Sequence, residues 1–310
     1  MAIKKLMITG GSGMVGRNIM EHPMAKLWHI LCPSSKELDL TNDFAVAKYV
    51  GLNNPDIIIH AAGEVGGIHA NIKHPVAFFE INVAIGRNII MAAYKAGIQN
   101  FINIASTSMY PMDVEKTLRE DTILSGKLDP SNEGYAIAKI MATRLCQYVM
   151  RENTNLNYKT IIPCNLYGRY DKFDPNKSHM LPAIIRRIHL AKINNDKSVK
   201  IWGDGLARRE FMYAGDIADA VLRAANDLDA LPELMNCGLG YDYTVQEYYE
   251  VVADVVGWDK EFVHDLTKPV GVQQRLCSIE RQSDWGWSAS TVLREGIKST
   301  YDFYLNEAKL

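Results

Sequence analysis

The chain has little of what marks secreted, membrane-bound or nucleic-acid-binding proteins. Its 310 residues carry 34 Lys and Arg against 36 Asp and Glu, so no basic excess attracts nucleic acid or an anionic membrane. The five cysteines are an odd number without C-x-x-C spacing, which argues against a disulfide framework. No apolar run approaches the ~18 residues of a membrane span, and MAIKKLMITGG leaves no room for a signal peptide. We expect a cytoplasmic protein with a small-molecule partner, without nucleic-acid or membrane partners and without a metal site.

What the first half does contain is an alternation of short apolar runs with stretches of helical periodicity. Strands are predicted at 3–9, 27–31, 56–60, 100–105 and 158–163, and helices at 76–96 and 135–150. This alternation is typical of right-handed βαβ units around a parallel sheet. We therefore predict an α/β fold with a Rossmann-type doubly wound parallel sheet over residues 1–165.

The pattern changes after about residue 165, where loops become longer. Helices are predicted near 180–193, 215–228 and 289–307, with a strand at 199–203. No repeat, low-complexity tract or Pro/Gly linker separates this part from the first. Residues 166–310 are predicted to form mainly a smaller C-terminal substrate-binding lobe, and a return of about 199–220 to the first domain is left open.

A glycine-rich turn follows the first predicted strand. In ITGGSGMVGRNI the spacing G-x-x-G-x-x-G allows a tight turn, close approach of the backbone to a pyrophosphate, and a helix N-terminus facing that negative charge. A plain glycine turn is the alternative, but the position after the first strand of a βαβ chain favours a dinucleotide. The predicted cofactor-binding residues here are Gly10, Gly13, Met14, Val15 and Gly16, with Ala61 and Ala62 after the third strand.

The end of the second strand indicates which nicotinamide cofactor is used. An acidic residue there would bind the ribose 2′-hydroxyl of NAD, whereas Ser34, Ser35 and Lys36 suit the 2′-phosphate of NADPH. We predict NADPH/NADP, with Asp39 and Leu40 also in contact with it. A solvated loop is the alternative, and the nearby Glu37 leaves the assignment open.

Tyr135 and Lys139 stand at i and i+4 on one predicted helix, where a lysine would lower the pKa of a proton-donating phenol. The same spacing also occurs where an aromatic packs over a solvated lysine. The hydroxyl cluster of ASTSMYP, residues 105–111, ends the fourth predicted strand. Together with the glycine turn these are three parts of one active site, in the order that the fold requires.

With these parts in place, the chain resembles the GDP-L-fucose synthase family of extended short-chain dehydrogenases/reductases along nearly its whole length. The residues that carry the resemblance are AAGEVGGIHAN (61–71), NEGYAIAK (132–139), CNLYGRYDKFDPNKSHMLPAIIRR (164–187), IWGDGLARREFMY (201–213) and KPVGVQQRL (268–276). The resemblance implies a homodimer that reduces a GDP-linked 4-keto sugar with NADPH.

Carried over position by position, the resemblance implies a reductase triad of Thr107, Tyr135 and Lys139. Thr107 would bind the C4 ketone, Tyr135 would protonate its oxygen, and Lys139 would hold the nicotinamide ribose. The remaining positions fall where the family binds its substrate: Asn165 at the sugar, and Arg187, Trp202 and Arg209 at the GDP. The alternatives are a core position for Trp202 and a solvated helix face for Arg186 or Arg187.

One position departs from the family pattern. The family has a cysteine after the triad hydroxyl, which epimerises C3 and C5 together with a histidine; here Ser108 replaces it, and His179 is retained. An alcohol is a poorer acid/base group than a thiol at neutral pH. We therefore expect a reductase without efficient epimerase activity, serving surface or capsule polysaccharide synthesis.

Because of this departure, several candidate substrates and functions have to be compared. Gly134, where the family usually has proline, would reshape the wall beside the sugar and fit a substrate other than the usual 6-deoxyhexose. The resemblance suggests a GDP-4-keto-heptose as that substrate, with a 4-keto-6-deoxyhexose as the other choice. The first rival is a bifunctional epimerase-reductase, and the second is a non-catalytic NADP-sensing protein, which the Tyr/Lys pair disfavours. A 4-epimerase or 4,6-dehydratase is disfavoured too, because a dehydratase would want an acidic residue where Ser108 stands.

Overall fold

The computed structural model describes residues 3–308 except 113–116, 176–177, 269 and 271. Its centre is a six-stranded sheet in the order β11-β6-β4-β3-β1-β2, in which every pair of neighbours is parallel. The strands are β1 (Lys5–Thr9), β2 (His29–Leu31), β3 (Ile57–His60), β4 (Asn100–Ile104), β6 (Asn157–Pro163) and β11 (Leu234–Cys237). The predicted Rossmann-type sheet is confirmed.

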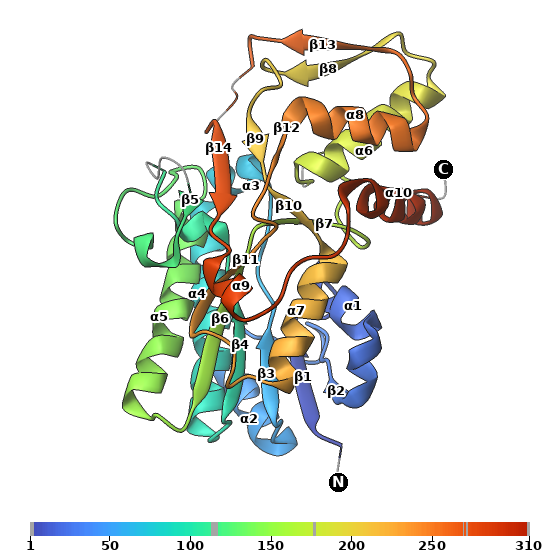
Figure 1. The fold of residues 1–310 in the computed structure, drawn as a ribbon. Coiled ribbons are helices and arrows are strands. Elements are labelled where there is room, and N and C mark those ends of the chain that lie inside the picture. The colour runs from blue at the N-terminus through green and yellow to red at the C-terminus, as the bar shows by residue number, and fades with distance from the viewer. Residues whose placement is uncertain (1–2, 113–116, 176–177, 269, 271, 309–310) are drawn as a thin grey trace.

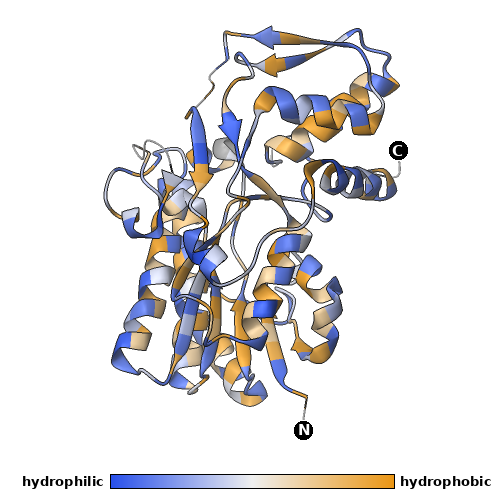
Figure 2. Ribbon diagram, in the orientation of Figure 1, coloured by the Kyte–Doolittle hydropathy of each residue, from blue (hydrophilic) through white to orange (hydrophobic). Residues whose placement is uncertain are grey.

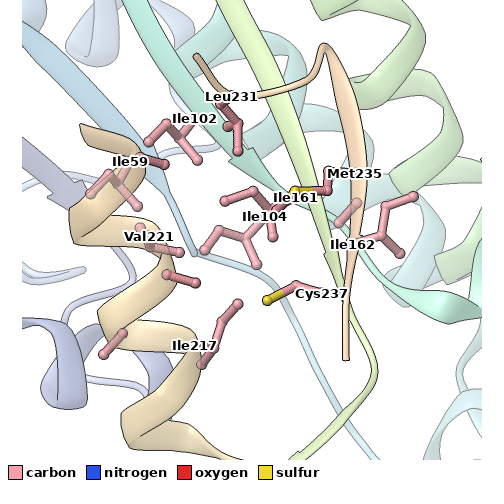
Figure 3. Packing of buried hydrophobic residues seen from close by; sticks show 14 of the residues in the cluster. Ile59, Ile102, Ile104, Ile161, Ile162, Ile217, Val221, Leu231, Met235 and Cys237 are labelled. Atoms are coloured by element: carbon pink, nitrogen blue, oxygen red, sulfur yellow. The ribbon is translucent and has the colours of Figure 1, made fainter. Parts of the chain in front are cut away.

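Helices cover both faces of this sheet (Figure 1). On one face α1 (Met14–Glu21) and α7 (Ala214–Asn226) pack on each other, and Figure 3 shows Ile217 and Val221 of α7 beside Ile59, Ile104 and other strand residues. The other face carries α2 (Asp43–Asn53), α4 (Pro75–Lys95) and α5 (Glu133–Glu152) over a separate apolar cluster. Because both faces of the sheet are covered, its inner strands are buried at nearly every residue rather than at every second one.

Helix α4 is long and apolar enough to cross a membrane by length and composition alone. In the fold, however, it packs between α2 and α5, and half of its apolar window is buried. The approach to α5 is close, since a Cβ added at Gly86 would lie 3.3 Å from the Cβ of Ala142. Burial of Asn82 and Asn88 is compensated by hydrogen bonds to backbone carbonyls. α4 is therefore a core helix of this domain.

The second part of the molecule has its own apolar core. It lies among α6 (Met180–Ile193), α8 (Val245–Val256) and α10 (Leu293–Ala308). In Figure 2 these helices carry both blue and orange stretches, as expected for helices with one buried and one exposed side. Three small sheets complete this part: β8 (Ser198–Trp202) with β13 (Glu261–Asp265), β7 (Asn165–Tyr167) with β10 (Phe211–Tyr213), and β12-β9-β14-β5, formed by Tyr243–Thr244, Arg208–Arg209, Gln274–Cys277 and Thr117–Leu118.

Each predicted strand and helix overlaps an observed one, but several predicted edges are wrong: residues 3–4 precede β1, and residues 289–292 precede α10. Residues 27–28 do not belong to β2, because Pro23–Leu27 forms a 3₁₀ helix whose first turn is capped by the His22 side chain.

The chain also passes repeatedly between the two parts. Within 199–220, β8 pairs with β13 of the second part, whereas α7 packs on α1. Later still, β11 returns to the edge of the main sheet beside β6.

Candidate active site

The glycine-rich turn between β1 and α1 is shaped for close approach of a ligand. Gly10 has a φ of 77°, and an added Cβ would lie 2.6 Å from the backbone nitrogen of Ala62, so only glycine fits there. Gly16 packs directly against the Gly10 carbonyl. At the α1 N-terminus Gly13 provides no side-chain cap and the first turn has no acidic residue. Met14 and Val15 open the helix, and the amides of this first turn suit the pyrophosphate that the sequence predicts here.

The loop after β2 suits the 2′-phosphate of NADPH. Glu37 accepts hydrogen bonds of 2.8 Å from both the backbone nitrogen and the hydroxyl of Ser34, and these bonds lower the pKa of its carboxyl. The Glu37 carboxylate therefore stabilises the loop through these two hydrogen bonds and is not a free acidic group. Among the described residues, the exposed side chains of Ser35 and Lys36 have no hydrogen-bond partner and can bind an anion.

Two further predicted cofactor residues, Asp39 and Leu40, shape the entry into α2. Asp39 accepts hydrogen bonds from the nitrogen and hydroxyl of Thr41, at 2.9 and 2.7 Å. The carbonyl of Leu40 accepts a hydrogen bond of 3.0 Å from Asn88 on α4. The Asp39 carboxylate and the Leu40 carbonyl thus hold this loop in place.

Tyr135 and Lys139 lie one turn apart on α5, at the carboxyl end of β4. The ammonium of Lys139 lies 5.8 Å from the centre of the Tyr135 ring and donates a 2.9 Å hydrogen bond to the carbonyl of Ile104. Burial lowers the pKa of Lys139 to about 8 and raises the pKa of Tyr135 to about 12. The Tyr135 side chain is partly exposed to solvent, yet enough protein surrounds its hydroxyl for burial to raise its pKa.

The hydroxyl that meets Tyr135 is that of Ser106, which the sequence reasoning missed. An interaction with the Ser106 side chain lowers the pKa of Tyr135, against the larger rise that burial causes. Ser106 continues the extended backbone of β4, whereas Thr107 begins a 3₁₀ turn, Thr107–Met109. The available signal was that Ser106 is the first hydroxyl after the strand, because side-chain direction follows the extended chain. We therefore propose Ser106, in place of Thr107, as the third member of the triad.

Ser108 and His179 lie in different surroundings. Ser108 is buried, and its hydroxyl oxygen has no hydrogen-bond partner in the described part of the chain. His179 is the N-cap residue of α6 and is exposed by area, yet the surrounding protein and the Lys172 ammonium lower its pKa. No hydrogen bond joins the two side chains.

The predicted substrate residues line the lobe. Asn165 is exposed at the start of β7 and donates a 3.0 Å hydrogen bond to the Glu210 carbonyl. Arg187 donates hydrogen bonds to the Lys200 carbonyl at 3.0 Å and to the Tyr249 hydroxyl at 2.7 Å, and it lines a cavity of about 330 Å³ between α6 and β8. Arg186 lines the same cavity, so neither arginine is merely a solvated helix face.

Trp202 and the neighbouring strands offer further binding groups. The Trp202 side chain is 50% exposed and the Lys268 ammonium lies 5.7 Å from its ring centre, so a core position for this indole is excluded. The motif residues 176, 177, 269 and 271, which flank parts of this region, lie outside the described residues.

Arg275, which the sequence reasoning did not single out, faces Arg209. The two residues are register partners on the parallel strands β14 and β9. Burial lowers the pKa of both guanidinium groups, and the nearby charge of Arg275 further lowers the pKa of Arg209. In the described chain neither guanidinium forms an ion pair with a carboxylate. An anion such as a diphosphate would stabilise these two neighbouring positive charges.

Comparison with known proteins agrees with this arrangement. A model of the NAD dependent epimerase/dehydratase family matches residues 6–238. GDP-L-colitose synthase of Yersinia pseudotuberculosis is 48% identical over 303 residues, covering 98% of both chains. GDP-L-fucose synthase of Azorhizobium caulinodans is 47% identical over 302 residues, covering 97% of this chain and 96% of that protein. The NADP-bound structure of a GDP-mannoheptose C4 reductase from Campylobacter jejuni is 27% identical with a TM-score of 0.88, covering 98% and 99%.

Proposed function

The chain belongs to the NAD dependent epimerase/dehydratase family, and we propose that it is an NADPH-dependent C4 reductase of a GDP-4-keto sugar without efficient C3/C5 epimerase activity. It is an NADP-dependent oxidoreductase of the GDP-4-keto-sugar reductase type, and NADP(H) is its cofactor. The sugar is a 4-keto-heptose or a 4-keto-6-deoxyhexose. The setting we propose is cytoplasmic nucleotide-sugar synthesis for a surface or capsule polysaccharide.

The observation that carries this proposal is the contact of Tyr135 with Ser106 and its position one turn from Lys139. With a pKa near 12, Tyr135 holds its proton at neutral pH and can donate it to the developing alkoxide at C4. The Ser106 hydroxyl binds the same oxygen, and the Lys139 ammonium supplies positive charge beneath the phenol. NADPH, when bound, supplies the hydride that reduces C4. Tyr135 is then reprotonated from solvent.

The substrate fits the remaining groups of the cleft. We assign the nucleoside to the cavity lined by Arg186 and Arg187, and the diphosphate to the register partners Arg209 and Arg275. We assign Asn165 and His179 to binding of the sugar. These assignments place polar and cationic groups where a GDP-sugar is polar and anionic.

The absence of efficient epimerase activity is supported by the surroundings of Ser108. Removing a proton next to a ketone needs a base, and an alcohol becomes one only beside a second base. The Ser108 hydroxyl is enclosed, and in the described residues no partner accepts its proton. The rival function, a bifunctional GDP-L-fucose synthase, is favoured by the names of the relatives and by the retained His179.

Isotope exchange in deuterated water separates the two functions. GDP-4-keto-6-deoxymannose is incubated with the protein, NADPH is added, and the product is analysed by mass spectrometry and NMR. We expect no deuterium at C3 or C5 at turnover rates, together with NADPH oxidation when a separate epimerase or a 4-keto-heptose analogue provides the correct configuration. Deuterium at both carbons at the rate of NADPH oxidation would establish the bifunctional enzyme instead.

We also propose a homodimer formed through α4 and α5. Apolar side chains on the outer sides of these helices are exposed in the single chain, namely Val76, Phe79, Ile137 and Tyr148. Exposed apolar residues gathered on two adjacent helices are typical of a protein interface. A symmetric dimer would bury this surface on both copies at once.

A further inference from the structure

The short segment Arg169–Lys172 runs from a contact with α1 to a contact with the segment after β3, and we name it the strap. It follows β7 and leads toward α6, whose N-cap is His179. At its first end the strap is bound to α1, the helix behind the glycine-rich turn. Arg169 forms an ion pair of 2.8 Å with Glu21, and the Arg169 carbonyl accepts a 3.2 Å hydrogen bond from Asn18.

Tyr170 strengthens this first anchor. Its hydroxyl donates a hydrogen bond to Glu21, the Arg17 guanidinium lies 4.8 Å from its ring centre, and Phe303 of α10 packs edge-on at 4.7 Å. Tyr170 has a φ of 70°, in the left-handed region that an aromatic residue rarely adopts. Such a conformation persists only where surrounding contacts hold it. Contacts with the rest of the fold therefore hold the strap in this conformation.

At its other end the strap reaches the segment that follows β3. The Lys172 ammonium donates a 3.3 Å hydrogen bond to the Val65 carbonyl. Two residues earlier in that segment, a Cβ added at Gly63 would lie 3.8 Å from the Lys139 ammonium, so the segment borders the reductase site. No described carboxylate forms an ion pair with Lys172, so its bond to Val65 is the contact that fastens this end.

We propose that the strap closes over the bound dinucleotide, and that Lys172 is the positioning residue that fastens it across the cleft. A dinucleotide running from the glycine-rich turn to Lys139 would lie between the two anchors, because one anchor is on α1 and the other is beside Lys139. The strap retards cofactor release. The inference rests on the proposed function only for the identity of the cofactor.

The decisive measurement is the rate of NADPH release, followed by stopped-flow fluorescence after displacement with excess NADP⁺, which needs no sugar substrate. We expect Lys172→Met to release NADPH about tenfold faster, as fits loss of one charge-assisted hydrogen bond. Lys172→Arg, which can still donate to the Val65 carbonyl, should stay close to wild type. The matched control is Lys192→Met, because Lys192 also donates to a backbone carbonyl, that of Val256 at 2.6 Å, but within the lobe.

Hydrogen exchange provides a second readout that does not depend on the cofactor. Amides of residues 63–73 should exchange faster in Lys172→Met than in Lys192→Met, and Lys172→Arg should restore protection. If Lys172→Met fails to fold, Tyr170→Phe tests the other anchor with the same two measurements. If NADPH release rates and amide exchange in Lys172→Met equal those in the control, the proposed role of the strap is wrong. Failure of the wild-type protein to bind NADPH would instead refute the proposed function, while the exchange comparison still tests the strap.

Discussion

At the scale of single residues, the cleft holds two ionisable groups whose proton affinities burial shifts in opposite directions. Burial favours the neutral form of both Tyr135 and Lys139, so the phenol holds its proton more tightly and the ammonium loses its proton more readily. With pKa values near 12 and 8, the phenol is protonated and the lysine is charged at neutral pH. This is the state that proton donation to a ketone requires.

A first prediction distinguishes the two hydroxyls at the end of β4. Ser106→Ala removes the group that binds Tyr135, and we expect kcat of ketone reduction to fall on the order of 10²-fold, within the range for general acid assistance. The matched variant Thr107→Val should lose less than about threefold. Steady-state NADPH oxidation is the measurement. The opposite order of effects would restore Thr107 as the triad residue.

A second prediction concerns the pH dependence. The lysine is charged below its pKa, so kcat/KM for reduction should be constant below about pH 8 and should fall as pH rises through that value. Lys139→Arg keeps its charge to far higher pH, so the alkaline limb should move upward even if the maximal rate drops. A pH profile measured with both proteins tests this. An alkaline limb that stays in place in the arginine variant would assign it to another group.

At the scale of elements, the sequence predicts a helix or strand when neighbouring residues alone determine it, and fails when the element depends on distant parts of the chain. The helices α4, α5, α6 and α7 and the first strands follow from apolar periodicity, which a chain shows whatever it packs against. The two-residue strands β9 and β12 have no such pattern, because they form only where distant segments meet. The 3₁₀ helix at Pro23–Leu27 also escaped prediction, since its cap is one histidine side chain rather than a periodic pattern.

At the scale of the whole molecule, the chain passes several times between the main sheet and the second part, and a buried carboxylate links segments of the two. Glu210, next to Arg209, accepts hydrogen bonds from the backbone nitrogens of Leu239 at 2.6 Å and Cys277 at 2.8 Å. Burial raises the pKa of its carboxyl while these amides oppose the rise. The carboxylate thereby ties β9 and β14, which carry Arg209 and Arg275, to the chain that leaves the edge strand β11.

A third prediction, also at this scale, tests the homodimer. Phe79→Asp places a charge on the exposed side of α4 and should convert a dimer into a monomer with the chain mass of 34.8 kDa. Phe44→Asp is the matched control, since Phe44 is a still more exposed phenylalanine on α2. Sedimentation velocity reports both. A monomeric wild type, or dissociation by the control as well, would contradict the proposed interface.

The sequence by itself determined the βαβ order, the glycine turn and the Tyr135–Lys139 spacing, because these depend on chain geometry over a few residues. Only the tertiary structure decided that Ser106 meets Tyr135, that Arg275 faces Arg209, and that Lys172 reaches Val65. Arg275 and Arg209 lie far apart in the chain, and so do Lys172 and Val65. Their distances in space depend on how whole elements pack, which no local spacing contains.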